Sequence, residues 1–292
     1  MEMSRRSFVA GTAAAAVGAT AAAGLAVADE AAEAPAKGAW SWSEKPADIT
    51  DDQISQTIDC DVCIIGLGAG GAPSALYAAT HGLSTVVLQK GDHAISNGWC
   101  ANAINNKAWL ESGGEPFNTT ELFSDFVNYT NGRENGVLVK MFIERGGEVM
   151  NWVLDQTTEI EPQIVEQGQT IGWFNADDFQ SRYARFAELL TLMSDKAEEA
   201  GAQMLWDTPA VRLCTSEDGA TVTGAIGQNA DGEYIKVNAS KGVLLACGDV
   251  TDDPEMVECF CLLLSGVRSL HGYPNNTGDG VRMGSWIGAK IT

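Results

Sequence analysis

The 292-residue chain has little positive charge, and this scarcity excludes several classes of function. It contains 18 lysine and arginine residues against 39 aspartate and glutamate residues, so its formal net charge at pH 7 is -21. An acidic chain repels the phosphate backbone of nucleic acids and anionic membrane surfaces. We therefore expect no nucleic-acid partner. Histidine is also scarce, with 3 residues, so few side chains can exchange protons near neutral pH.

The cysteines lack the pattern of a disulfide framework or of a haem attachment site. There are 7 of them, and an odd number leaves at least one thiol unpaired. Cys60 and Cys63 have C-x-x-C spacing, but no histidine follows Cys63, which excludes haem attachment. Cys259 and Cys261 offer two more thiols for a zinc site, whereas the apolar neighbours favour buried thiols in strands or helices. We expect no metal site.

The N-terminus is the exception to the acidic composition. Arg5 and Arg6 precede a weakly apolar, alanine-rich run that ends in an A-x-A sequence at residues 26–28. These features predict a signal peptide over residues 1–28. Residues 4–8, SRRSF, resemble the twin-arginine export motif, which predicts export to the periplasm, the cell envelope or the extracellular face. The alternative is a membrane anchor, since the run is nearly long enough to span a bilayer.

Residues 29–58 mix alanine, proline and acidic residues without a sustained period, and we expect a linker there. Trp40 and Trp42 are candidates to dock on the surface of the domain that follows. The pattern changes at Asp59, where an apolar strand, a glycine turn, a helix over 72–81 and a strand over 85–88 follow one another. This is a βαβ unit, and both strands have the composition of a buried parallel sheet.

The rest of the chain alternates between helical and β-rich stretches. Helices are expected near residues 121–129, 137–155 and 179–200. Hairpin turns are expected at residues 217–219 and 231–232, and a last strand over 242–246. Together with the βαβ unit, this order predicts one Rossmann-like α/β domain over residues 59–292.

The glycine turn matches the G-x-G-x-x-G pattern and lies between a buried strand and a helix. Gly66 permits the tight turn, Gly68 lets the backbone approach a pyrophosphate, and Gly71 lets the helix pack closely on the sheet. The helix N-terminus then offers N–H groups and a positive dipole end to the phosphates. This context predicts a dinucleotide site.

An acidic residue usually lies about twenty residues further on, where it binds the adenosine ribose. Gln89 occupies that place. Its carbonyl is able to accept a hydrogen bond from a hydroxyl, more weakly than a carboxylate does. On this assignment, Gln89→Glu should tighten cofactor binding. The alternative is that Gln89 only ends the strand.

Six motifs occur in an order that resembles the FAD-binding domain of the fumarate reductase/flavocytochrome c flavoprotein family. They are CIIGLGAGG, VVLQKG, ISNGWCANAINN, TPAVRL, KGVLLACGD with DPEM, and NTGDGVRMGSWIGA. Members of that family reduce activated carbon–carbon double bonds. The resemblance implies FAD as cofactor, an enoate-type small-molecule substrate, and a separate electron donor such as a cytochrome or a quinol-linked carrier.

The resemblance also implies roles for individual residues. Gln89 and Lys90 would meet the adenosine, and the backbone of Val211 the adenine. Cys247 stands where the family has threonine, so a weak S–H donor replaces a hydroxyl. Asp279 would lie near the ribityl chain; its alternative role is the N-cap of a helix that starts near Val281. The implied cofactor-binding residues are Gly66, Gly68, Gly70, Gly71, Gln89, Lys90, Ser96, Asn97, Gly98, Val211, Ala246, Cys247, Gly248, Thr277, Gly278 and Asp279.

No catalytic residue is expected within the chain. In the family, the capping domain, the proton-donating arginine and the residues that clamp the substrate follow the Thr-Gly-Asp-Gly turn, which here lies close to the end of the sequence. We therefore expect a truncated flavoprotein that is inactive or weakly active alone. The alternatives are a flavin-binding fragment completed by a second polypeptide that supplies the cap, and an NAD-dependent dehydrogenase.

The remaining basic residues give no strong candidate for an acid. His81 and His93 are expected at the surface, and His271 is the histidine that is able to approach a flavin. Arg268 and Arg282 are expected to be solvated charges.

Overall fold

A computed structural model describes residues 40–165, 170–261, 263 and 275–291. The predicted signal peptide, the first part of the predicted linker, Arg268 and His271 lie outside these residues. Among the described helices, none has the length and apolar character needed to span a bilayer.

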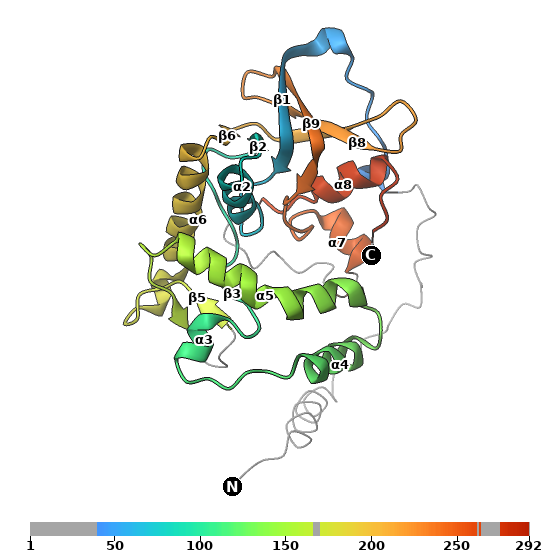
Figure 1. The fold of residues 1–292 in the computed structure, drawn as a ribbon. Helices are drawn as coiled ribbons and strands as arrows, with labels where there is room; N and C mark the ends of the chain where they lie inside the picture. The colour runs from blue at the N-terminus through green and yellow to red at the C-terminus, as the bar shows by residue number, and fades with distance from the viewer. Residues whose placement is uncertain (1–39, 166–169, 262, 264–274, 292) are drawn as a thin grey trace, which may run out of the picture. The chain divides into compact units, whose positions relative to one another are not determined.

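A six-stranded sheet carries the candidate site, with the strand order β6-β2-β1-β9-β8-β7 (Figure 1). The first four strands pair in parallel, β8 pairs antiparallel with β9, and β7 pairs antiparallel with β8. This arrangement confirms the Rossmann-like α/β prediction. The strand bounds are β1 Ile54–Ile65, β2 Thr85–Leu88, β6 Gln203–Leu205, β7 Ala210–Thr215, β8 Val222–Gln228 and β9 Tyr234–Leu245.

The two faces of this sheet bury different cores because successive side chains of a strand point to opposite faces. On one face, Ile64 and Val87 pack with α2 (Gly71–Thr80), α5 (Gly136–Gln156) and α6 (Arg182–Glu199). On the other, Cys63 and Ile65 pack with Met283 of α8 (Asp279–Trp286). Burial raises the pKa of the Cys63 thiol to about 12, so the thiol is protonated at neutral pH.

The remaining elements include a small antiparallel sheet of order β3-β5-β4, which was not predicted from the sequence. Asn106, Asn118 and Asn135 cap α3, α4 and α5 by accepting hydrogen bonds from first-turn N–H groups. The bounds are β3 Cys100–Asn102, β4 Gln163–Ile164, β5 Thr170–Gly172, α3 Lys107–Glu111, α4 Thr119–Thr130, α7 Pro254–Phe260, η1 Ser41–Ser43, η2 Asp51–Gln53 and η3 Phe179–Ser181.

The predicted helices and hairpins are confirmed, with small shifts at their ends, but two strand boundaries are wrong. The expected last strand over 242–246 is the second half of β9, which runs unbroken from Tyr234. The first strand begins at Ile54, not at Asp59, because its polar, largely exposed first half pairs with the first half of β9. Polar residues on a solvent-exposed ladder carry no apolar signal, so the pattern did not reveal them.

The described part of the expected linker is packed on the domain. Trp42 is buried, its ring centroid lies 5.3 Å from that of Phe260, and its carbonyl accepts a hydrogen bond from Trp286 Nε1 at 3.0 Å. Arg212, also buried, donates to the carbonyl of Ala47 at 2.7 Å. These contacts fix the segment that leads into β1.

Candidate functional site

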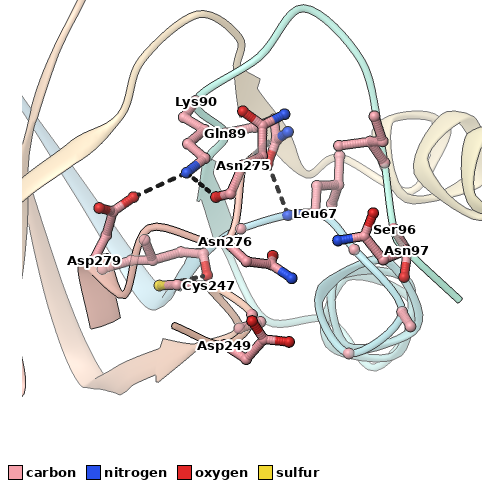
Figure 2. Close-up of a pocket in the computed structure, with 18 of the residues that line it drawn as sticks. Leu67, Gln89, Lys90, Ser96, Asn97, Cys247, Asp249, Asn275, Asn276 and Asp279 are labelled. Atoms are coloured by element: carbon pink, nitrogen blue, oxygen red, sulfur yellow. Dashed lines mark hydrogen bonds and ion pairs between the residues drawn. The ribbon is translucent and has the colours of Figure 1, made fainter. Parts of the chain in front are cut away.

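A cleft of about 530 Å³ opens where β1, β2 and β9 end (Figure 2). Carboxyl ends of adjacent parallel strands meet at one edge of a sheet, which is where open α/β folds bind ligands. The cleft brings together twelve of the residues expected at the cofactor: Gly66, Gly68, Gly70, Gln89, Lys90, Ser96, Asn97, Gly98, Ala246, Cys247, Gly248 and Asp279.

The glycine loop forms the first wall, and steric contacts explain two of its glycines. Gly66 has φ +95°, and a Cβ there would lie 2.4 Å from the carbonyl oxygen of Ala246. A Cβ at Gly71 would lie 1.9 Å from the carbonyl oxygen of Gly66. Both distances are shorter than any real Cβ contact, so only glycine fits. Gly71 lies buried in α2 and shapes the loop without lining the cleft.

The loop presents free backbone donors to the cleft. Gly68, Ala69 and Gly70 line it, and among the described residues their N–H groups donate to no acceptor. They lie at the start of α2, a 10-residue helix whose dipole places partial positive charge at this end. Free N–H groups at a helix N-terminus bind phosphate groups.

The segment that follows β2 forms the second wall. A Cβ at Gly68 would lie 3.0 Å from the carbonyl oxygen of Ile95, so this glycine also permits the two walls to touch. Ser96, Asn97 and Gly98 line the cleft, and Ser96 Oγ accepts a hydrogen bond from the Gly98 N–H at 3.1 Å. The segment is thus folded on itself beside the glycine loop.

The third wall is the turn before α8, which side chains hold in place. Lys90 Nζ donates to Asp279 Oδ2 and to Thr277 Oγ1, each at 3.1 Å, and also to the carbonyl of Asn275. Thr277 Oγ1 donates to Asp279 Oδ1 at 2.9 Å. Figure 2 shows Lys90, which follows β2 in the chain, reaching across to this turn. Within the described residues, Lys90 is the single cation that lines the cleft.

Asp279 does not act as an N-cap, which corrects the alternative expected for it. It is the first residue of α8, whose N-cap is Gly278 at φ +72° without a side-chain cap bond. A Cβ at Gly278 would lie 2.2 Å from Met256 Sδ, so the turn sits directly on α7. The Asp279 carboxylate is therefore available to Lys90 and to the cleft.

Arg282 is not a solvated charge, contrary to expectation. Its Nη2 contacts Asp253 Oδ2, and Asp253 is buried with 8% exposure. Asp253 Oδ1 also caps α7 by accepting from the Met256 N–H at 2.9 Å. The ion pair ties α8 to α7 beneath the turn, and the sequence offered no signal that would pair two residues so far apart.

Ala246, Cys247 and Gly248 continue from β9 into the cleft. Cys247 Sγ donates to the carbonyl of Ile65 at 3.5 Å. Burial, with a smaller contribution from the Asp279 carboxylate, raises the pKa of the Cys247 thiol to about 11. The thiol is therefore protonated at neutral pH and acts as a neutral part of the wall.

Three other expected residues do not line the cleft, although their neighbours do. Pro209 and Ala210 take the place expected for Val211. Thr277 donates a hydrogen bond to Asp279, and Gly278 is the N-cap residue directly before it. Asp249, Asn275 and Asn276 also line the cleft beside the motifs, and they were not among the residues predicted from the sequence. All three are polar residues next to a motif, and that position is the sequence feature that could have predicted them.

An apolar cavity of about 540 Å³ adjoins the cleft, and Ala69 lines both. Aromatic and aliphatic side chains of β3, α5 and α6 dominate its lining, including Phe142, Met150 and Trp173. Its one charged residue among those described, Arg145, is paired with Glu148 at 2.7 Å. The cavity suits an apolar group next to the phosphate-binding loop.

The described histidines lie away from both cavities. His81 ends α2, is exposed and stacks on Tyr77, and His93 is exposed and contacts Asp92. Both placements match the surface expectation. The described residues include no group of three or more histidine, cysteine, aspartate or glutamate side chains placed to hold a metal ion.

Comparison with known proteins agrees with this geometry. The profile of the family described as "FAD binding domain" matches residues 61–292. The vinyl phenol reductase of Lactiplantibacillus plantarum is 27% identical over 79% of this chain and 46% of its own length. The digoxin reductase of Eggerthella lenta is 29% identical over 80% of this chain and 45% of its own length. The chain thus spans about half the length of these curated relatives.

Solved structures show the same fold. The open conformation of a flavocytochrome c3 fumarate reductase superposes with a TM-score of 0.68 at 21% identity, over 86% of this chain and 45% of that one. A 3-ketosteroid-delta4-(5alpha)-dehydrogenase from Rhodococcus jostii gives a TM-score of 0.68 at 17% identity, over 82% of this chain and 56% of that one.

The residues present fit FAD. Free N–H groups at Gly68, Ala69 and Gly70 are suited to bind its pyrophosphate. The glycines of the loop carry no side chain that would block the approach of the pyrophosphate, and at two of them the packing leaves no space for one. Lys90 supplies a positive charge, and Asp279 supplies acceptors for sugar or ribityl hydroxyls. The adjoining apolar cavity is suited to flat, weakly polar groups.

Proposed function

The chain belongs to the FAD binding domain family, and on that premise we propose that it forms the flavin-binding part of an oxidoreductase that reduces an activated C=C bond of a small organic acid. One observation carries the proposal: the phosphate-binding cleft lies next to an apolar cavity, and Ala69 lines both. Two relatives whose names describe reductases support the same class.

In this proposal the chain binds and orients its cofactor. The glycine loop holds the pyrophosphate, the segment over residues 95–98 encloses it, and Asp279 holds hydroxyl groups. Bound FAD supplies hydride transfer to the double bond. Arg145 and Lys90 each have a carboxylate partner, so we assign no proton donor among the described residues.

A separate carrier, such as a cytochrome or a quinol-linked protein, is proposed to deliver the electrons. Twin-arginine export is proposed because residues 4–8 carry the paired arginines. Cell fractionation tests the export: the protein with Arg5→Lys and Arg6→Lys should stay in the cytoplasm. Secretion of that variant at the normal level would contradict the proposed route.

A reduced viologen assay tests the proposed activity. The chain is loaded with FAD, the flavin absorption is confirmed, and fumarate, urocanate and a cinnamate are offered as acceptors. Oxidation of the viologen that depends on an acceptor supports the reductase assignment. Flavin binding without turnover of any enoate, by this chain and by one extended with the second half of a relative, would contradict it.

A second candidate function is a flavin-binding subunit that a second polypeptide completes. Exposed apolar side chains on α5 favour it, because Val137 is 77% exposed, Met141 53% and Val149 55%. The viologen assay separates the two candidates by the way in which the second half is supplied. The subunit candidate predicts turnover when the second half is added as a separate polypeptide, whereas the first candidate predicts turnover only when the second half is joined to this chain.

A further inference from the structure

Gln89 is buried at the end of β2, and both ends of its side-chain amide bond to the backbone. Its exposed fraction is 4%. Oε1 accepts a hydrogen bond from the Leu67 N–H at 2.9 Å, and Nε2 donates to the carbonyl oxygen of His93 at 3.0 Å. Figure 2 shows Gln89 beside Leu67 in the wall of the cleft. The amide therefore links the glycine loop to the segment that follows β2.

This pair of bonds requires a donor and an acceptor on one planar group. A carboxylate at position 89 would still accept from Leu67, but it has no hydrogen to offer His93. Two acceptor oxygens would then face each other in a buried place, where unpaired polar groups weaken the structure. The contacts of Gln89 thus explain why this chain has an amide where an acid is usual.

We propose that Gln89 is a positioning residue for FAD, which holds the glycine loop and the segment after His93 at the separation that receives the dinucleotide. Leu67 lies between Gly66 and Gly68, and Ile95 touches Gly68 across the cleft, so the two bonded segments are the first two walls. The inference rests on FAD binding alone and is independent of the proposed reductase activity.

The proposal predicts an unusual pH dependence for Gln89→Glu. Burial raises the pKa of a carboxyl group, so mild acid protonates it. A protonated glutamate donates its O–H to the His93 carbonyl and accepts from Leu67 through its other oxygen, as the amide does. The charged or titratable groups on the segments bonded to residues 89–91 are Lys90, Asp92, His93 and Asp207. The wild type has the same groups, so their titration affects both proteins and cancels in the ratio of the two FAD affinities.

The experiment is an FAD titration of the full chain at about pH 8 and about pH 5, followed by flavin fluorescence. At about pH 8, Gln89→Glu should bind FAD roughly tenfold or more weakly than the wild type, since a buried group loses its partner. At about pH 5 the ratio to wild type should return to within roughly threefold. Gln89→Met, which lacks both bonds, should bind weakly at both pH values.

The opposite pattern would overturn the proposal. If the residue at position 89 contacts the ribose directly, Gln89→Glu should bind more tightly than the wild type at pH 8, because an ionised acceptor makes a stronger bond. Weak binding by Gln89→Glu at both pH values, or unchanged binding by Gln89→Met, would also overturn it.

The hydrogen-exchange rate of the Leu67 amide, measured without FAD, gives a second test. The Leu67 amide should exchange faster in Gln89→Met than in the wild type and should stay protected in Gln89→Glu, because a carboxylate still accepts from it. Equal exchange in Gln89→Met and wild type would contradict the proposal. Gln228→Glu is the matched control: Gln228 Nε2 donates to the Gly232 carbonyl at 3.0 Å on the exposed hairpin, so its loss should leave FAD affinity unchanged at both pH values.

Discussion

The glycine-loop wall and the wall at the α8 turn are built in different ways. At Gly66 and Gly71 the backbone packs so closely that a single Cβ would collide with a carbonyl oxygen. At the turn, Lys90, Asp279 and the Arg282–Asp253 pair hold the chain through side chains from distant elements. The glycine-loop wall depends on shape, and the wall at the α8 turn depends on charge. We expect substitutions in the two walls to differ in their effects on stability and on FAD affinity.

Gly71→Ala should have the largest effect. Its Cβ would lie 1.9 Å from the Gly66 carbonyl oxygen, so the loop or α2 must shift. We expect a loss of about 3 kcal/mol or more in the free energy of unfolding, as for severe overpacking. Chemical denaturation measures it. The matched control is Gly70→Ala, where the nearest contact is 3.9 Å and φ is -90°, and a loss equal to that of Gly71→Ala would contradict the steric account.

Arg282→Met should have the next largest effect, because it leaves the buried Asp253 carboxylate without its partner. We expect about 2 kcal/mol of destabilisation, less than for a fully buried pair because the arginine side chain is 32% exposed. Arg145→Met is the matched control, since the Arg145–Glu148 pair is 62% and 67% exposed and should contribute little. Equal melting temperatures for the two variants would mean that charge does not hold the wall at the α8 turn.

Lys90→Met tests the contact that joins the walls. Its ion pair with Asp279 is about one third exposed, and we expect roughly 1 kcal/mol, or fivefold, in FAD affinity. The affinity of the wild type should also fall more steeply with salt than that of the variant. Lys236→Met, which removes a lysine of similar exposure from the far end of the sheet, should leave FAD affinity unchanged. An equal loss in both variants would show a general charge effect.

The Cys247 thiol should give the smallest effect, at alkaline pH. Its pKa is raised from the ordinary 9.0 to about 11 in the folded chain, so its contribution to stability is present below pH 9 and is lost as pH rises towards 11. Between about pH 8 and pH 9.5 the wild type should lose roughly 0.7 kcal/mol more than Cys247→Ala does. Denaturation at both pH values measures this difference, and parallel losses would contradict the assigned pKa.

The same contrast explains what the sequence predicts well. The glycine loop, the 85–88 strand and the hairpins follow from local spacing and apolar runs, and the structure confirms them. Arg282 and Gln89 acquire their partners only when separate segments meet in the fold, so no local pattern distinguishes an ion pair from a solvated charge. The polar start of β1 was missed for a related reason, since its partner strand lies in the second half of the chain.

The contact between Gly66 and Ala246 has a consequence for the order of folding. The strand that leads into the glycine loop pairs with β9, and Ile65 and Cys247 are separated by 182 residues along the chain. Pairings of such high sequence separation close late and slowly. During synthesis the phosphate-binding loop therefore lacks this neighbour until the chain up to Cys247 has left the ribosome. We therefore expect FAD to bind after β9 has paired with β1, and we expect earlier intermediates to expose an unpaired edge of β1.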